Sequence, residues 1–189
     1  MGPDLILRFL HAVDDELAML VKDGRRLDLY LIGRSALILR SGLNLATRDV
    51  DMVGRMGDRE LEEQALELFG KGSLGARTHG LYLEEVPQGL PPIPGGYKNR
   101  ARELPGNWRV LRPREPEAHD LAVTKLKRFH AADQEDLKIL CDRGDLTAGG
   151  LERALASAFM WEADDDPGHE AAKANLGVVL AYLDTGAGL

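Results

Sequence analysis

Two aspartates stand one residue apart in the stretch DVDMV, at Asp49 and Asp51. Side chains alternate across a β-strand, so on a strand these two carboxylates point to the same side, while Val50 and Met52 point to the other. Two such charges need a proton, a cation or hydrogen-bond donors close by. A divalent cation that prefers oxygen ligands, typically Mg²⁺, is the natural neutraliser. The edge of a turn or a helix cap is the other interpretation, because Asp-x-Asp occurs often by chance.

A glycine ends the preceding apolar stretch LDLYLIG, at Gly33. A strand that ends in glycine and opens a helix lets backbone N–H groups and the helix dipole approach a phosphate closely. Arg34 and Ser35 would add a positive charge and a hydroxyl at the same place. Taken alone, Gly33 favours an ordinary tight strand-to-helix turn. Beside the aspartate pair, it predicts a phosphate cradle next to metal-binding carboxylates.

The elements that must position these residues follow from hydrophobic periodicity and from capping residues. Strands are expected over residues 27–33, 49–53, 80–86 and 108–112. Helices are expected over residues 4–24, 34–42 and 58–70, and later over 116–129, 133–141, 147–161 and 167–183. Prolines and glycines fill residues 87–106, which predicts a long loop that is functional or disordered.

This order of elements predicts an α/β (α+β) fold. We expect a small mixed sheet flanked by helices, with a helical C-terminal half. The expected division is an α/β core over residues 1–115 and a helical region over residues 116–189 that packs on that core.

Composition limits the classes of partner. The chain has 189 residues and a net charge of −7, which argues against a grip on nucleic acid by the whole surface. The charge is uneven, because Lys and Arg gather between residues 98 and 130 whereas residues 162–166 read EADDD. The basic stretch faces either a phosphate-bearing ligand or, as is more common, solvent.

The expected compartment is the cytoplasm. No apolar run reaches the length of a membrane span, and the N-terminal residues do not read as a secretory signal. Cys141 is the single cysteine, which excludes an internal disulfide and a cysteine-rich zinc site. We therefore expect a reduced cytoplasmic protein with no membrane partner.

The stretch IGRSALILRSGLNLATRDVDMV resembles the signature of the nucleotidyltransferase superfamily, in which a hydrophobic residue, Gly, and Gly or Ser precede an Asp-x-Asp or Asp-x-Glu. The chain is most similar to bacterial nucleotidyltransferase-like proteins of uncertain function that are related to abortive-infection toxins. The later stretch HDLAVTKLKRFHAADQEDLKIL extends the likeness, which spans about residues 27–140. Arg34 departs from the pattern, because the family has a second small residue there.

The resemblance implies a metal-dependent transfer of a nucleoside monophosphate from a nucleoside triphosphate, with two Mg²⁺ ions. Asp49 and Asp51 would bind metal, and a third carboxylate would come from a later strand. Glu84 is the choice because Tyr82, Glu84 and Val86 share a strand face, and because LYLEEVP resembles the strand of the family that carries the third aspartate; Glu85 points to the opposite face. Glutamate replaces the aspartate of the family at this position.

Further nucleotide-binding residues follow from the same resemblance. Gly33, Arg34 and Ser35 would cradle the phosphates, with Lys125 opposite them. On the helix expected over residues 116–129, Lys125 falls inside the apolar arc. A lysine at such a position either snorkels to the surface or lines a cleft, and the resemblance favours the cleft.

Two later acids, Asp133 and Asp136, also match positions that the family keeps. At the start of a helix, however, they are better explained by capping and by the helix dipole, with Asp133 as the N-cap.

The acceptor of the transfer stays open among an RNA end such as that of tRNA, a protein and a small molecule. The alternative function is a non-catalytic nucleotidyltransferase-fold binding or regulatory protein, with an antitoxin-like partner.

Overall fold

The computed structural model describes residues 1–54, 57–87, 89–160 and 166–189, and the chain divides into two compact units. The first unit comprises Met1–Gln88 and Ala101–Pro116, and the second comprises Gly89–Arg100 and Glu117–Leu189. The α+β class, the small mixed sheet and the helical C-terminal half are confirmed. Residues 89–100, which we expected in the first region, group with the helices of the second.

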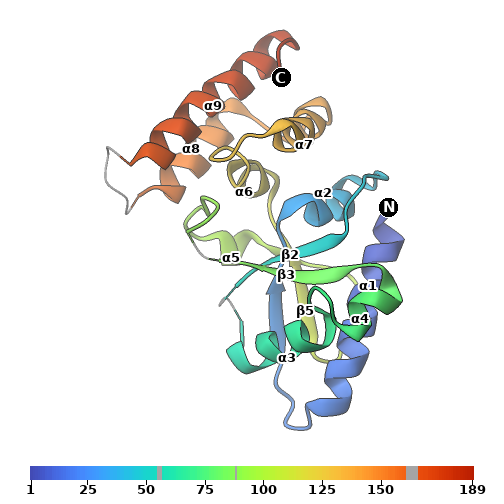
Figure 1. Cartoon of the computed structure of the whole chain (residues 1–189). Coiled ribbons are helices and arrows are strands. Elements are labelled where there is room, and N and C mark those ends of the chain that lie inside the picture. Colours follow the sequence, from blue (N-terminus) through green and yellow to red (C-terminus); the bar gives the residue numbers. More distant parts are fainter. Residues whose placement is uncertain (55–56, 88, 161–165) are drawn as a thin grey trace. The chain divides into compact units, whose positions relative to one another are not determined.

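Figure 1 labels the elements along the chain. The helices of the first unit are α1 (Pro3–Leu20), α2 (Gly33–Ser41), α3 (Arg59–Phe69) and α4 (Leu74–His79). Its strands are β1 (Leu27–Tyr30), β2 (Asp49–Val53), β3 (Tyr82–Val86), β4 (Arg102–Glu103) and β5 (Leu111–Glu115). The helices of the second unit are α5 (Tyr97–Arg100), α6 (Ala118–Val123), α7 (Ala131–Asp142), α8 (Ala148–Ala158) and α9 (Pro167–Thr185).

The strands of the first unit form two ladders. In one ladder β5 lies between β1, to which it is parallel, and β4, to which it is antiparallel. In the other, β2 and β3 are parallel. A single antiparallel bridge between Leu31 and Met52 links the end of β1 to β2. The expected mixed sheet is therefore small and has a break between its two ladders.

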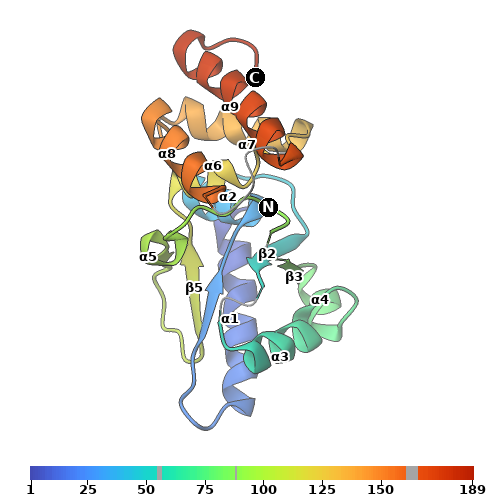
Figure 2. The ribbon, with the colours of Figure 1, turned by 90° about the vertical axis from the view of Figure 1, so that its left-hand side faces the viewer.

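Helices cover the apolar side of these strands, and Figure 2 shows α1 running beside β5. Helix α1 buries residues at helical spacing, among them Ile6, Phe9 and Val13, which are at most 1% exposed. The Asp58 carboxylate caps α3, because it accepts a hydrogen bond from the Leu61 N–H. This apolar packing stabilises the two ladders from the side opposite the polar faces of β2 and β3.

The fourth expected strand begins later than its sequence indicated. We expected it over residues 108–112, but β5 spans Leu111–Glu115. The N–H groups of Arg109, Val110 and Leu111 all donate to the buried carboxylate of Asp14 on α1, at 2.7–2.9 Å. The Asp14 side chain therefore binds the N–H groups at the start of β5, while the Val110 carbonyl oxygen accepts a 2.8 Å hydrogen bond from the Leu27 N–H of β1.

The Pro/Gly-rich stretch over residues 87–106 is more regular than expected, apart from Gln88, which lies outside the described residues. It contains the short helix α5 and the strand β4. Within the second unit the Arg100 guanidinium forms two hydrogen bonds with the buried carboxylate of Asp120, at 2.7 and 2.9 Å. This ion pair supplies order that the proline and glycine content alone argues against.

Two helices also differ from expectation. Helix α4 was not predicted, because it is a short helix between glycines; the Ser73 hydroxyl caps it by accepting from the Ala76 N–H. Helix α6 ends at Val123, before the expected end at residue 129, and Phe129 has a left-handed φ of 50°.

Other expected helices are present with shifted ends. The N-cap of α7 is His130, so the prediction of Asp133 as the N-cap is wrong; Asp133 lies in the first turn. Helix α8 ends at Ala158, before its expected end at Trp161, which itself lies outside the described residues, as do the aspartates at 164 and 165. Asp166 caps α9, because its carboxylate accepts a hydrogen bond from the His169 N–H. No helix in the described part of the chain combines the length and the apolar character that a membrane span requires.

Candidate metal centre

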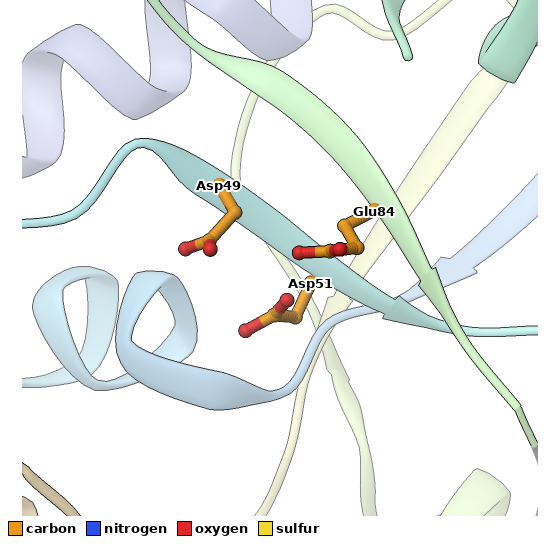
Figure 3. A group of neighbouring side chains, drawn as sticks. All are labelled: Asp49, Asp51 and Glu84. Atoms are coloured by element: carbon orange, nitrogen blue, oxygen red, sulfur yellow. The ribbon is translucent and has the colours of Figure 1, made fainter. Parts of the chain in front are cut away.

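Neighbouring parallel strands bring three carboxylates together. In the register of β2 and β3, Asp51 lies opposite Glu84, and Asp49 lies opposite Tyr82. One carboxylate oxygen from each of Asp49, Asp51 and Glu84 lies within 4.8 Å of the others. Figure 3 shows the three side chains on one side of the two strands, where α2 begins. The predicted convergence of the aspartates, and the choice of the strand face for Glu84, agree with this geometry.

The three carboxylates create a negative electrostatic potential around them. The Asp49 and Asp51 side chains are half-buried, so solvent screens their charges only in part. Burial raises the pKa of the neighbouring Tyr82 phenol, and the negative charges of Asp49, Glu84 and Asp51 raise it further. The carboxylates therefore concentrate negative charge, and a bound cation would stabilise their ionised forms.

A threonine that the sequence analysis missed orients one of the carboxylates. The Thr47 hydroxyl donates a hydrogen bond of 2.6 Å to Asp49 Oδ1. Such a bond fixes the rotation of the carboxylate, as outer-shell partners of metal ligands commonly do. The signal in the sequence is a hydroxyl residue two positions before the first aspartate, in the stretch TRDVD.

Gly33 brings the start of α2 against Asp51. Its φ of 68° lies in the left-handed region, which favours glycine. A Cβ at this position would collide with the Asp51 carboxylate. The Ile32 N–H also donates to the Asp51 carbonyl oxygen at 3.0 Å. The glycine that was expected in a phosphate cradle thus lies directly beside a carboxylate of the cluster.

The two residues after Gly33 have different environments. Arg34 is half-buried in the first turn of α2. Ser35 is 0% exposed, and its hydroxyl donates to the Ile32 carbonyl oxygen at 3.3 Å. In this arrangement the Ser35 hydroxyl stabilises the turn. The groups at the start of α2 that could bind a phosphate are therefore backbone N–H groups.

Lys125 has a protein partner instead of the phosphate implied by the resemblance. It belongs to the second unit, follows α6 and is only 4% exposed. Its ammonium donates a 2.6 Å hydrogen bond to the carboxylate of Asp136, which is 2% exposed. The side chain therefore neither snorkels nor lies open to a ligand, because a buried ion pair holds it.

Asp133 has a structural environment in the same unit, as preferred from the sequence. Its buried carboxylate accepts two hydrogen bonds of 2.8 Å from the Arg128 guanidinium and one from the His130 N–H. Burial alone would raise the pKa of Asp133, but these bonds to the charged form outweigh it and lower the pKa.

Most arginines of the basic central stretch are neutralised within the protein. Arg109 pairs with Asp15, whereas Arg112 and Arg114 share the carboxylate of Asp28 at 2.7 Å. Arg100, Arg102 and Arg128 also pair with carboxylates. Of the two interpretations of this stretch, a continuous basic surface for a phosphate-bearing ligand is therefore disfavoured.

The donor set at β2 and β3 fits a hard divalent cation. Asp49, Asp51 and Glu84 offer carboxylate oxygens alone, which Mg²⁺ and Mn²⁺ prefer, and no thiol or imidazole belongs to this group. Each carboxylate has a second oxygen, so the group could bridge two ions as well as bind one.

Comparisons with known proteins identify a family for this chain. No curated protein matches the chain, and no solved structure does. A family model described as "Nucleotidyltransferase of unknown function (DUF6036)" matches residues 8–165, which include all three carboxylates and well over half of the chain. This family suggests a divalent metal, in agreement with the acidic cluster. The chain therefore belongs to the DUF6036 family of nucleotidyltransferases of unknown function.

Proposed function

We propose that this protein transfers a nucleoside monophosphate from a nucleoside triphosphate to a hydroxyl of an acceptor, with Mg²⁺ bound at Asp49, Asp51 and Glu84. The observation that carries the proposal is the convergence of these carboxylates within 4.8 Å beside the glycine-opened start of α2. Phosphoryl and nucleotidyl transfer depend mainly on positioning and on charge stabilisation, and this arrangement can supply both.

Each group has a defined role in the proposed step. The acceptor hydroxyl oxygen forms a bond to the α-phosphorus. The bond between that phosphorus and the oxygen that bridges it to the β-phosphorus breaks, and pyrophosphate leaves with the electron pair. Glu84 accepts the hydroxyl proton, and the N–H groups at the start of α2 bind the phosphates of the donor. When bound, Mg²⁺ would neutralise the charge on the attacking and leaving oxygens.

Label transfer tests this proposal. The protein is incubated with each of four α-³²P-labelled nucleoside triphosphates, Mg²⁺ and either total cellular RNA or total cellular protein. We expect label in one acceptor fraction, none after chelation with EDTA, and none with Asp49→Asn. Label that persists in Asp49→Asn, or in EDTA, would overturn the assignment of the site.

A non-catalytic binding or regulatory role is the second candidate, and Arg34 favours it. This half-buried arginine stands where the superfamily pattern has a small residue, at the turn that would approach a phosphate. Its guanidinium would serve as a bidentate phosphate ligand in an enzyme, but would crowd the turn in a catalytically silent relative. If a triphosphate binds without label transfer to RNA, to protein or to a small hydroxyl compound, this second role is favoured, together with an antitoxin-like protein partner.

A further inference from the structure

The acidic face of β2 and β3 continues beyond the carboxylates to an aromatic ring. Tyr82 opens β3, lies opposite Asp49 in the register, and shares its strand face with Glu84. The residue is half-buried, so part of its surface is accessible to solvent. The Gly33 side of the cluster adjoins Asp51, and the Tyr82 side adjoins Asp49. The cluster therefore lies between a glycine at the start of a helix on one side and an aromatic residue on the other.

One cation lies near this ring, and a second belongs to a residue whose backbone binds that of Tyr82. The Lys71 ammonium lies 5.8 Å from the centre of the Tyr82 ring. Lys71 directly follows Gly70, whose backbone forms a β-bridge with Leu83 of β3. The Arg48 carbonyl oxygen accepts a 3.1 Å hydrogen bond from the Tyr82 N–H, which places Arg48 at the start of the same two strands. Both side chains belong to exposed residues.

These cations differ from the arginines of the central stretch. Those arginines bind carboxylates, whereas neither Arg48 nor Lys71 forms an ion pair with any residue that the structure describes. The Lys71 distance is near the outer limit for a cation–π contact, so little energy holds its ammonium on the ring. An aromatic residue with a weakly held ammonium near its ring, and an exposed arginine at the start of the same strands, can bind an anion that also carries a flat group.

We propose that Tyr82, Lys71 and Arg48 form the acceptor subsite, and that the acceptor is a nucleotide unit. Its base would stack on Tyr82, its phosphate would lie between Lys71 and Arg48, and its hydroxyl would face the carboxylates. This inference rests on the proposed function and adds the chemical class of the acceptor. The unit is either a free nucleotide or the end of a nucleic acid, and a grip on one such unit is compatible with an acidic protein.

Calorimetric titration of two probes tests the subsite. The donor side is first saturated with Mg²⁺ and a non-hydrolysable analogue of whichever triphosphate binds. The probes are then AMP, for a free nucleotide, and the 5′-phosphorylated dinucleotide pApA, for a nucleic-acid end. Binding of either probe supports a nucleotide acceptor, and the tighter probe identifies its source.

Variants locate that binding. We expect Tyr82→Leu to weaken the probe by about 5- to 100-fold, whereas Tyr82→Phe retains most of the affinity because stacking needs the ring and not the hydroxyl. Lys71→Ala and Arg48→Ala should each weaken it and lower the slope of log affinity against log salt by about 1. Lys22→Ala, which removes another exposed lysine without an ion pair in the described part, is the matched control and should bind as the wild type does.

The failures are distinguishable. If the triphosphate analogue binds but neither probe does, or if Tyr82→Leu and Lys71→Ala bind the probes as tightly as the wild type, the acceptor subsite is overturned and the proposed function stands. If no triphosphate binds in the presence of Mg²⁺, both are overturned. Circular dichroism of each variant shows whether a loss of binding accompanies a loss of folding.

Discussion

Gly33 is subject to two constraints at once. Its backbone is left-handed, and its α-carbon faces the Asp51 carboxylate so closely that no side chain fits. Gly42, at the other end of α2, has a similar φ of 72° but open space around it. The pair therefore separates backbone strain from collision with the candidate metal ligand.

We predict that Gly42→Ala lowers the unfolding free energy by about 1–2 kcal/mol, the cost of a left-handed non-glycine residue. Gly33→Ala should cost more, because Asp51 must also move, and it should abolish metal binding. Urea unfolding of both variants gives the comparison. Equal losses in the two variants would mean that Asp51 yields freely and that the close approach has no structural importance.

Thr47 offers a second prediction at this scale. Thr47→Val keeps the shape of the side chain but removes the hydrogen bond to Asp49, so we expect divalent-metal affinity to fall by about 10- to 100-fold. Thr47→Ser restores the hydroxyl and should restore the affinity. The measurement is calorimetric titration of Mn²⁺ into each variant; a Thr47→Val protein that binds Mn²⁺ like the wild type would remove Thr47 from the site.

The meeting of the two aspartates was predictable because it depends on a local rule: alternation along β2 puts Asp49 and Asp51 on one side. The third carboxylate was implied by the resemblance to the superfamily, and the register of β2 with β3 brings Glu84 opposite Asp51. The partner of Lys125 was not predictable in the same way. Its place in an apolar arc is compatible with a cleft, a snorkelling side chain or an ion pair, and only the packing of α6 against α7 identifies Asp136.

At the scale of elements, tertiary contacts explain why some strands and loops begin or end at other residues than periodicity predicts. Asp14 binds backbone N–H groups that lie 95 to 97 positions later, and this delays the start of β5. The Arg100–Asp120 pair orders a stretch whose prolines and glycines predict a loop. No local pattern contains either interaction, because both join residues from different elements.

The buried pair of Lys125 and Asp136 gives a prediction for the helical unit. Lys125→Met removes the buried ammonium that donates to the Asp136 carboxylate, so we expect the unfolding free energy to fall by about 3–5 kcal/mol. The double variant Lys125→Met/Asp136→Leu removes both charges and should recover much of that loss. Denaturant unfolding measures all three proteins; a double variant no more stable than Lys125→Met would contradict the importance of this charge pair.

At the scale of the whole molecule, internal ion pairs neutralise much of the positive charge of an acidic chain. The net charge is −7, yet the arginines near the centre of the sequence bind carboxylates from α1, β1, α6 and α7. Among these carboxylates, Asp133 has a pKa that is lowered in the folded protein, so its protonation in acid should lower the unfolding free energy. The pKa of Asp120 is raised instead, because burial outweighs its bonds to Arg100.

Asp133 allows this to be measured. Its folded pKa lies below the ordinary value of 3.8, so its stabilising contribution is present above that value and is lost as the pH falls through the folded pKa. We predict that the unfolding free energy drops less between about pH 5 and about pH 2 in Asp133→Asn than in the wild type. Asp184→Asn, at an exposed position of the same unit, is the control. Parallel curves for Asp133→Asn and the wild type would contradict the bonds to Arg128 as the source of the shift.

The central claim is that Asp49, Asp51 and Glu84 hold a divalent cation that joins the protein to a triphosphate. Isothermal titration of the four nucleoside triphosphates, with and without Mg²⁺, into the wild type and Asp51→Asn tests it most directly. We predict Mg²⁺-dependent binding of at least one triphosphate to the wild type and no detectable binding to Asp51→Asn. Equal affinity in the two proteins, or binding that ignores Mg²⁺, would contradict the account.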